Sequence, residues 1–421
     1  MFGINKAFIF AGYLLIVSCA GAGLPVSENT RAVNGSTKNI TSIVWESSPG
    51  AVADGNDGQL IVRASESINM LYAVHDNQGK QDLFMSKTKN IGDSFSGRVR
   101  VNSEKGEVSA HGENGPKLKQ GKGRGIFAAW VGNRDIKFSR SMNFGKSFSP
   151  AIRVNDDDGK ASQSFFTMEV APDGTVYIAW LDGRHKKSGK PGTSSIYLAR
   201  SFDQGKTFGK NIKIAADICP CCRPALAFGN NGEIFASWRH VYPDNERIIV
   251  VATSMDGGET WSDPVKTIET GWKINGCAHS GPVMKYLGEK LLITWYTGRN
   301  EKASLKFAFS YDKGQSFQIA EDLNGSILDA NHPDIAVVGN EAWVIFQGRD
   351  PTENEGWGRE GAWLVRINEE GKASDPVPLP STGGSVAYPY LFPGNGGRVY
   401  ATWTEIGDKG SNVVLCRGRI N

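Results

Sequence analysis

The sequence lacks the features of several common protein classes. After residue 20 no helical hydrophobic period of any length is visible, so a helical fold is not expected. The apolar run from Ala7 to Val17 is too short for a comfortable membrane span. A formal net charge of +3 over 421 residues leaves no strong electrostatic footprint for nucleic acid, so no nucleic-acid partner is predicted.

What the sequence has in quantity is glycine, tryptophan and one recurring motif. The 51 glycines and 11 tryptophans suit a turn-rich all-β protein. In each copy of an eight-residue box the third residue is Asp or Asn, the fifth is Gly and the last is aromatic. These residues suit a hairpin turn in which the Asp or Asn accepts backbone N–H groups, the glycine takes a positive φ and the aromatic is buried. The copies lie at residues 88–95, 141–148, 201–208, 254–261 and 310–317.

The box belongs to a longer repeat of 50 to 60 residues, a period that indicates a solenoid, a propeller or an array. Each unit also has a short apolar strand that ends in an aromatic, at residues 128–130, 178–180, 236–238, 293–295, 344–346 and 401–403, with a weaker copy at 71–74. Thirteen or fourteen residues before that aromatic a further strand opens, at Pro116, Pro224, Pro282, Pro333 or Pro389, with Leu60 and Phe166 in the other two units.

This repeat predicts an all-β fold, a seven-bladed β-propeller of four-stranded blades over residues 39–421. The seventh unit has only three strands, and the segment 39–45 is expected to supply the fourth and close the ring. A six-bladed propeller of the sialidase type is the alternative.

The N-terminal residues predict export and a lipid anchor. Lys6, the short apolar run and the sequence Ile16-Val-Ser-Cys19 have the form of a bacterial lipoprotein signal. Residues 1–18 are then the signal peptide, Cys19 is the lipidated residue and residues 19–38 form a flexible tether. We expect a cell-envelope protein on the periplasmic side of the outer membrane. An ordinary signal peptide cleaved after Ala20 or Ala22 is the alternative.

The boxes resemble the Asp-box, or bacterial neuraminidase repeat, and residues 40–421 resemble the sialidase-like propeller superfamily. The resemblance implies that the boxes lie on the face of the ring away from the active site. It also implies a catalytic set of three arginines, a tyrosine activated by a glutamate, and an aspartic acid.

This sequence departs from the sialidase catalytic set. The first unit opens Gly58-Gln-Leu60 without the arginine that the family places there, and in the fourth unit Cys222 stands at that depth. Tyr388 could serve as the nucleophile, with Glu169 or Glu113 as its partner, but no spacing singles these residues out.

Cysteine and histidine gather at the rim opposite the boxes. Thiolate and imidazole together suit Cu(I) or Zn(II), and two of the segments enter neighbouring units at equal depth. The predicted metal ligands are Cys219, Cys221, Cys222, Cys277 and His279, completed or flanked by His332 and His111. A disulfide between Cys219 and Cys277 is the competing interpretation, because exported cysteines usually pair. Cys416 alternates like a buried strand residue.

Arginine forms a second group on the same rim. Arg184, Arg299 and Arg349 occupy the same turn in three units, and Arg223 follows the cysteines. Because a guanidinium binds carboxylate or phosphate through two parallel hydrogen bonds, these residues are candidates for an anionic ligand or glycan. Pairing with nearby carboxylates such as Asp182 or Asp350 is the alternative.

Three functions follow as hypotheses. The first is an exported lipoprotein with a copper or zinc centre for metal binding or redox chemistry. The second is an exo-acting glycosidase related to sialidases, and the third is a non-catalytic scaffold with structural disulfides. We favour the first because the departures from the family fall at the site while the scaffold is intact.

Overall fold

The structure is a computed structural model that describes residues 43–47, 50–63, 65, 67–88, 94–185, 194–267, 271–319, 322–408 and 410–420. The predicted signal peptide, Cys19, the tether and residues 39–42 of the predicted closing strand lie outside these residues. All described residues belong to one compact unit, Ser42–Asn421. None of its described helices is both long enough and apolar enough to cross a membrane.

Within the described residues the strands form six antiparallel sheets. One contains β3 (Asn56–Val62), β4 (Ile68–His75), β5 (Gln81–Thr88) and β6 (Ser96–Arg100). The next contains β7 (Lys117–Gln120), β8 (Ile126–Gly132), β9 (Asp135–Ser141) and β10 (Ile152–Arg153). An eight-stranded sheet contains β11 (Gln163–Val170), β12 (Val176–Asp182), β13 (Ser194–Ser201), β14 (Ile212–Ile218), β15 (Ala225–Phe228), β16 (Ile234–Val241), β17 (Arg247–Ser254) and β18 (Val265–Lys266).

The other three sheets follow in chain order. One contains β19 (Val283–Leu287), β20 (Lys290–Thr297), β21 (Ser304–Ser310) and β22 (Gln318–Ile319). Another contains β23 (Leu328–Val338), β24 (Glu341–Arg349), β25 (Glu360–Ile367) and β26 (Val377–Pro378). The last contains β27 (Ser385–Pro393), β28 (Arg398–Gly407), β29 (Gly410–Ile420), β1 (Ile43–Trp45) and β2 (Gly50–Asp54). The described helices are four short turns: η1 (Gly112–Asn114), η2 (Pro243–Asn245), η3 (Arg299–Glu301) and η4 (Asn354–Gly356).

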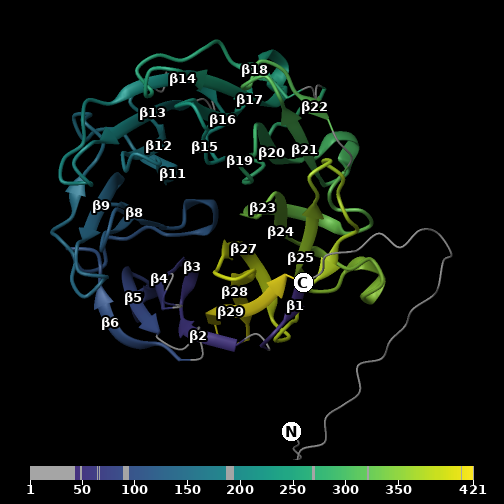
Figure 1. Ribbon diagram of the computed structural model, residues 1–421, viewed down its shortest axis with the longest axis horizontal. Coiled ribbons are helices and arrows are strands. Elements are labelled where there is room, and N and C mark those ends of the chain that lie inside the picture. Colours follow the sequence, from purple (N-terminus) through teal and green to yellow (C-terminus); the bar gives the residue numbers. More distant parts are fainter. Residues whose placement is uncertain are drawn as a thin grey trace, which may run out of the picture. The chain divides into compact units, whose positions relative to one another are not determined.

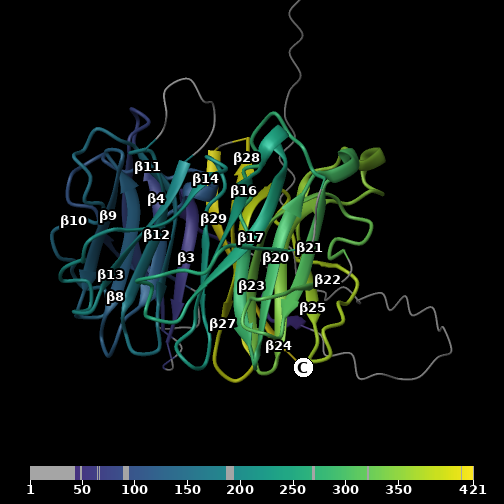
Figure 2. The ribbon, with the colours of Figure 1, turned by 90° about the horizontal axis from the view of Figure 1, so that it is seen from above.

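The sheets are arranged as the blades of a β-propeller. They stand around a ring with β3, β11, β15, β19, β23 and β27 nearest its centre (Figure 1), and the strands run roughly along the ring axis (Figure 2). In the eight-stranded sheet, β11–β14 and β15–β18 are joined by the single pair Ile218 and His240. The N-terminal strand β1 pairs antiparallel with Gly418–Ile420 of β29.

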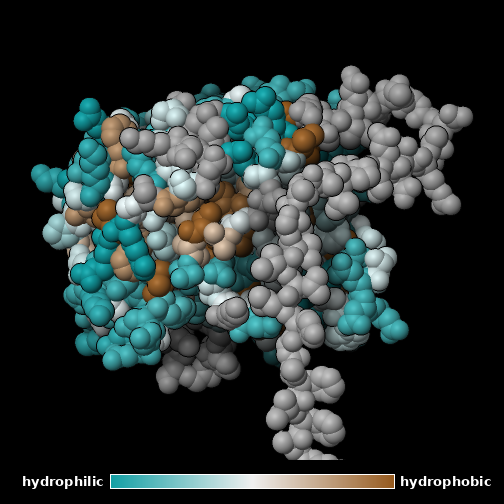
Figure 3. All heavy atoms as spheres, turned by 90° about the horizontal axis from the view of Figure 1, so that it is seen from below, coloured by the Kyte–Doolittle hydropathy of each residue, from teal (hydrophilic) through white to brown (hydrophobic). Residues whose placement is uncertain are grey.

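The hydrophobic core lies between neighbouring sheets. The aromatic that ends each of the six clear apolar strands is fully buried, with Trp130, Trp180, Trp238, Trp295, Phe346 and Trp403 all at 1% exposure or less. Burial of a side chain of this size stabilises the fold by roughly 2–3 kcal/mol. The side of the molecule drawn in Figure 3 is mainly hydrophilic where its residues are coloured, with a hydrophobic patch near the middle.

The predicted turn of the box forms in the four later copies, whereas most of the first copy lies outside the described residues. The closing aromatic is buried in one copy, at Phe317, and half-buried in the other three. The glycines Gly145, Gly205, Gly258 and Gly314 have φ between +75° and +90°. In the copy at 254–261, Ser254 Oγ accepts the Gly258 N–H at 2.9 Å and donates to Asp256 Oδ1 at 2.8 Å. The Thr260 N–H donates to the same carboxylate oxygen at 3.0 Å.

Three of the boxes also bond to a strand of the preceding repeat unit. Arg140 of β9 donates to the Gln204 carbonyl in the next box at 3.2 Å, and Arg200 of β13 donates to the Gly257 carbonyl at 2.8 Å. Thr253 of β17 donates to the Lys313 carbonyl at 3.1 Å. These three boxes therefore link successive repeat units.

The inner strands share a second repeated feature at the end where they begin. The register is interrupted by a bulge in β3, β11, β23 and β27. Each bulge contains a residue with positive φ: Asp57 (58°), Phe165 (45°), His332 (49°) and Tyr388 (51°). Such conformations cost about 1–3 kcal/mol for residues other than glycine, and they cluster at functional sites. The four bulges therefore indicate a functional site at the end of the ring where the inner strands begin.

Candidate functional site

A cavity of about 340 Å³ occupies the centre of the ring. It is lined by residues of seven inner strands, β3, β7, β11, β15, β19, β23 and β27, and by Arg223 just before β15. Lys119 of β7 and Lys285 of β19 both pair with Glu169, at 2.8 and 3.9 Å. The carboxylate of Glu169 is thus paired with lysines of the cavity wall.

At the end where the inner strands begin, Glu113 joins four parts of the ring. The turn η1, before β7, carries this buried glutamate. Its Oε2 lies 3.3 Å from Arg223 Nε and accepts the Gly281 N–H at 2.9 Å, while its Oε1 lies 3.3 Å from His332 Nδ1. Burial alone would raise the pKa of Glu113, but Arg223, His332 and the Gly281 amide outweigh it and lower the pKa to about 2. Glu113 is therefore a fixed carboxylate.

The local sequence explains how η1 reaches this position. Gly112 has a φ of +55°, and a Cβ there would stand 2.4 Å from the Tyr388 hydroxyl, so only glycine leaves room for that side chain. Asn114 accepts the Phe165 N–H at 2.7 Å and donates to the Ser109 carbonyl at 3.1 Å. The turn is thereby fastened to the bulge in β11.

His332 and Tyr388 lie side by side, with ring centroids 4.4 Å apart. The Tyr388 N–H donates to Gln347 Oε1 at 2.8 Å. Burial, and then the negative charges of Glu113 and Asp57, raise the pKa of Tyr388 to about 12. In the part of the chain that the structure describes, no carboxylate accepts a hydrogen bond from the Tyr388 hydroxyl. We call Glu113, His332, Tyr388 and Arg223 the mouth site.

Asp57 and Lys117 are two further buried charges beside the mouth site. Burial raises the pKa of Asp57 to about 6, although Lys117 and a hydrogen bond from Asn56 act in the opposite direction. Burial also lowers the pKa of Lys117 to about 8, and its Nζ donates to the Gly115 carbonyl at 3.1 Å. An acid and an amine that titrate near neutral pH are suited to proton transfer.

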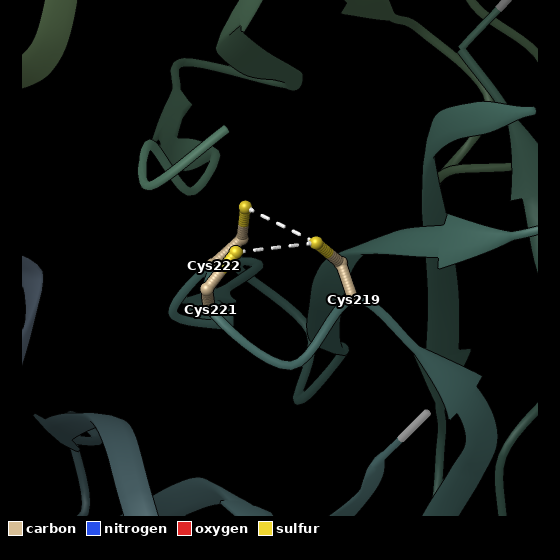
Figure 4. A group of neighbouring side chains, drawn as sticks. All are labelled: Cys219, Cys221 and Cys222. Atoms are coloured by element: carbon tan, nitrogen blue, oxygen red, sulfur yellow. Dashed lines mark hydrogen bonds between the residues drawn. The ribbon is translucent and has the colours of Figure 1, made fainter. Parts of the chain in front are cut away.

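A second group lies between the β14–β15 and β18–β19 loops. Cys219 Sγ lies 3.6 Å from Cys221 Sγ and 3.7 Å from Cys222 Sγ (Figure 4). Ligand atoms of Cys219, Cys221 and Cys222 lie within 4.8 Å of one another, as do those of Cys221, Cys277 and His279. We call these five residues the Cys/His cluster. Its cysteines are free thiols, so the alternative Cys219–Cys277 disulfide is absent.

Two buried arginines favour negative charge in the Cys/His cluster. Arg239 and Arg247 are 1% and 9% exposed. Within the described residues, Arg239 Nε and Arg247 Nε and Nη1 have no hydrogen-bond partner. Hydrogen bonds from Cys221 and Cys222, followed by the charges of Arg239 and Arg247, lower the pKa of Cys219. The same hydrogen bonds raise the pKa of the Cys221 and Cys222 thiols, so Cys219 is the first of the three to lose its proton. Thiolates would offset these guanidinium charges, whereas neutral disulfides would not.

The structure separates the predicted arginine group. Arg184 donates to Asp182 and Asp156, and Arg349 lies 3.4 Å from Asp329. Neither these two nor Arg299 lines the central cavity, whereas Arg223 does. For Arg184, pairing with carboxylates therefore fits the structure better than binding of an anionic ligand.

Other predicted residues are also redistributed. Glu169 pairs with lysines and not with Tyr388, whose pKa is affected by Glu113 instead. His111 stacks on Phe165 with centroids 6.2 Å apart. Among the described residues, neither His111 nor His332 belongs to a group that could hold a metal ion, so both lie outside the Cys/His cluster that they were expected to complete or flank.

Several residues of the site escaped the sequence analysis. Asp57 stands three residues before Leu60, the same offset as His279 before Pro282, so its place in the repeat could have revealed it. Lys117 follows Pro116 directly and carries a similar signal. Arg239 and Arg247 lie in ordinary strand positions, and no pattern marks them.

Comparisons with known proteins support the fold. A sialidase from Micromonospora viridifaciens is 26% identical over 252 residues, which cover 52% of this chain and 37% of that protein. The chain thus spans little more than a third of this curated relative. A polysaccharide lyase described as an ulvan lyase superposes with a TM-score of 0.57 at 12% identity, covering 89% of this chain and 95% of that one. A Hadza microbial sialidase gives 0.50 at 15% identity, covering 80% and 73%.

This chain has the β-propeller fold and is similar to a sialidase over part of its length. No protein-family model matches it. At these identities the similar structures show the fold alone. The chemistry has to be argued from the mouth site and the Cys/His cluster.

Proposed function

We propose that the protein is an enzyme that cleaves glycans containing carboxylate sugars, and that the mouth site performs the reaction. The observation that carries this proposal is the arrangement of Glu113, His332 and Tyr388 beside Arg223. A carboxylate that faces Nδ1 of an imidazole orients the ring and leaves Nε2 as a base. This function replaces metal binding, favoured by the sequence, as the primary hypothesis.

The site suits elimination better than sialidase-type hydrolysis. A tyrosine nucleophile needs a base to take its proton, and no described carboxylate accepts a hydrogen bond from Tyr388. In elimination, His332 takes the proton from the carbon next to the sugar carboxylate. The electrons of that C–H bond form a double bond as the glycosidic C–O bond breaks, and the Tyr388 hydroxyl protonates the leaving oxygen. Arg223 and Lys117 offset the charge that develops on the sugar carboxylate.

The relatives agree with an acidic glycan as substrate. The curated relative is named a sialidase, and one similar structure is described as an ulvan lyase bound to a saccharide that contains glucuronic acid. Sialic and glucuronic acids share a carboxylate, which is the group that Arg223 and Lys117 are suited to bind.

The test is to incubate the protein with a panel of glucuronate-containing polysaccharides and with a fluorogenic sialoside. Elimination creates an unsaturated sugar whose double bond absorbs ultraviolet light, whereas hydrolysis does not. We expect unsaturated products that disappear in His332→Asn. Sialoside hydrolysis without unsaturated products would overturn elimination, and no cleavage of either class would overturn the proposed function.

A second proposal concerns the Cys/His cluster, because the unpartnered N–H groups of Arg239 and Arg247 favour thiolates there. We propose that the cluster binds Zn(II) or Cu(I). A Zn(II) ion held by three thiolates carries a net charge of about −1, which the arginines would offset. Metal analysis of the purified protein should give a stoichiometric ion in wild type and Cys416→Ser, and none in the Cys221→Ser/Cys222→Ser variant. Equal metal content in all three would contradict the proposal.

We propose that the ring has seven blades. Support comes from the eight-stranded sheet, whose two four-stranded halves are joined by one residue pair, and from the seven inner strands around the cavity. An experimental structure that shows six would overturn this count.

We also propose that the mature protein is anchored in the cell envelope through Cys19, as the N-terminal sequence predicts. Incorporation of labelled fatty acid that is lost in Cys19→Ala would support the anchor. Equal labelling of both proteins would contradict it.

A further inference from the structure

Two loops of the Cys/His cluster run directly into the mouth site. Cys222 is followed by Arg223, whose Nε lies 3.3 Å from Glu113. His279 is followed by Ser280 and Gly281, and the Gly281 N–H donates to Glu113 at 2.9 Å. Two of the three groups that hold Glu113 thus stand within two residues of a cluster side chain.

The β18–β19 loop, which carries His279, also contacts His332. The His332 N–H donates to Ser280 Oγ at 3.3 Å. The position of His332 relative to Glu113 therefore depends on where residues 280 and 281 lie. A small displacement of residues 280 and 281 would therefore move the His332 backbone and its partner Glu113 together.

The two loops are in close contact. A Cβ at Gly281 would stand 2.3 Å from the Arg223 carbonyl oxygen, so glycine is required for this approach. Arg239 lies beneath both loops: its carbonyl accepts the Cys219 N–H at 2.9 Å and its Nη2 donates to the Ser280 carbonyl at 3.1 Å. The loops thus meet on one buried arginine.

Little regular structure supports the second loop. Among the described residues, no strand lies between the end of β18 at Lys266 and the start of β19 at Val283, and Cys277 and His279 are exposed. A segment with few backbone hydrogen bonds opens easily unless a cross-link holds it. The backbone of this loop is bonded to the β16–β17 turn at Trp272 and Ile274, but no backbone hydrogen bond holds the described residues 276–279. A bond between side chains of the two loops would link that part of the loop.

We infer that the Cys/His cluster is a positioning element of the mouth site, in which a bound metal ion joins the two loops and fixes Arg223, Ser280 and Gly281 around Glu113 and His332. The inference rests on the proposed glycan-cleaving function and on metal binding. The ion does not touch the substrate in this arrangement. The cluster ligands act only through the residues that follow them.

Hydrogen exchange followed by mass spectrometry tests the inference without any substrate. Zn(II)-loaded protein is compared with protein treated with a chelator, and Cys277→Ser is compared with the matched variant Cys416→Ser. We expect amide exchange in residues 276–282 to rise about ten-fold on chelation and in Cys277→Ser, and to stay unchanged in Cys416→Ser. Exchange in β25 should not change, because that strand has no contact with the cluster.

Activity provides the second measurement once a cleaved glycan is known. The rate constant kcat should fall in Cys277→Ser with KM little changed, and Cys277→His, which restores a ligand, should recover it. Loss of zinc without faster exchange in residues 276–282 would overturn the inference. An equal rise of amide exchange in β25 would also overturn it, because the metal would then stabilise the whole fold. If no glycan is cleaved, the exchange result still decides the positioning role.

Discussion

The box turns and the mouth site are both built on a repeated backbone feature, and they use it in opposite ways. Each box repeats the same side chains, and in the copy at 254–261 the Ser, Asp and Thr residues bond to one another. The bulges of the inner strands repeat only the backbone, with positive φ at Asp57, Phe165, His332 and Tyr388. Repetition of side chains marks structure here, and variation of side chains at a repeated backbone position marks the site.

The largest expected effect is on activity at the mouth site. His332→Asn removes the base, and we expect the rate of glycan cleavage to fall by about a hundred-fold or more with the fold intact. Tyr388→Phe should act similarly, because it removes the proton donor. Initial rates and circular dichroism check both. A variant that retains wild-type activity would remove its residue from the mechanism.

The next effect is on stability. Glu113→Ala leaves Arg223 buried without its carboxylate, which we expect to cost about 3–5 kcal/mol of unfolding free energy. Glu169→Ala, on the cavity wall, serves as the comparison and should cost less because Lys119 is partly exposed. Urea denaturation measures both. A smaller loss in Glu113→Ala than in Glu169→Ala would contradict the central place of Glu113.

The pH dependence of stability separates Asp57 from Glu113. The raised pKa of Asp57, about 6 against 3.8, means that its contribution is fully present below pH 3.8 and is lost as the pH rises through 6. In Asp57→Asn the unfolding free energy should therefore no longer fall between pH 3.8 and 6, a fall that we expect to be about 1–3 kcal/mol in the wild type. The depressed pKa of Glu113, about 2 against 4.5, acts oppositely: its contribution is present above 4.5 and is lost as the pH falls toward 2. Thermal unfolding across pH checks both signs.

The smallest effect is expected at the boxes. Ser254→Ala leaves the Gly258 N–H without its acceptor and should lower stability by about 1 kcal/mol with glycan cleavage unchanged. Ser310→Ala makes the same change in the next copy, where Ser310 Oγ accepts the Gly314 N–H. Equal losses in the two variants would support a purely structural role. A loss of activity in either variant would contradict the assignment of the boxes to structure and of the mouth site to function.

The sequence allowed the all-β repeat, the box turns and the gathering of the Cys/His cluster to be predicted, because these depend on register along one chain. His332 and Tyr388 were recognised by their place before a proline. Glu113 was one of two candidate partners of Tyr388, and the sequence could not choose between it and Glu169, since Glu113 reaches the site through a turn from another sheet.

The partners of the predicted arginines also depend on the fold. Arg184 occupies the expected turn, but Asp182, two residues earlier, binds its guanidinium. Sequence spacing gives the depth of a residue in its blade and not the direction of its side chain. Charge compensation across blades, as at Arg239 and Arg247, requires the folded structure.

The central claim is that the mouth site cleaves acidic glycans. It is tested most directly by following unsaturated products from a glucuronate-containing polysaccharide with wild-type protein, His332→Asn and Ser254→Ala side by side. The account predicts unsaturated ends from wild type and Ser254→Ala, and essentially none from His332→Asn. Equal product formation by wild type and His332→Asn would contradict it.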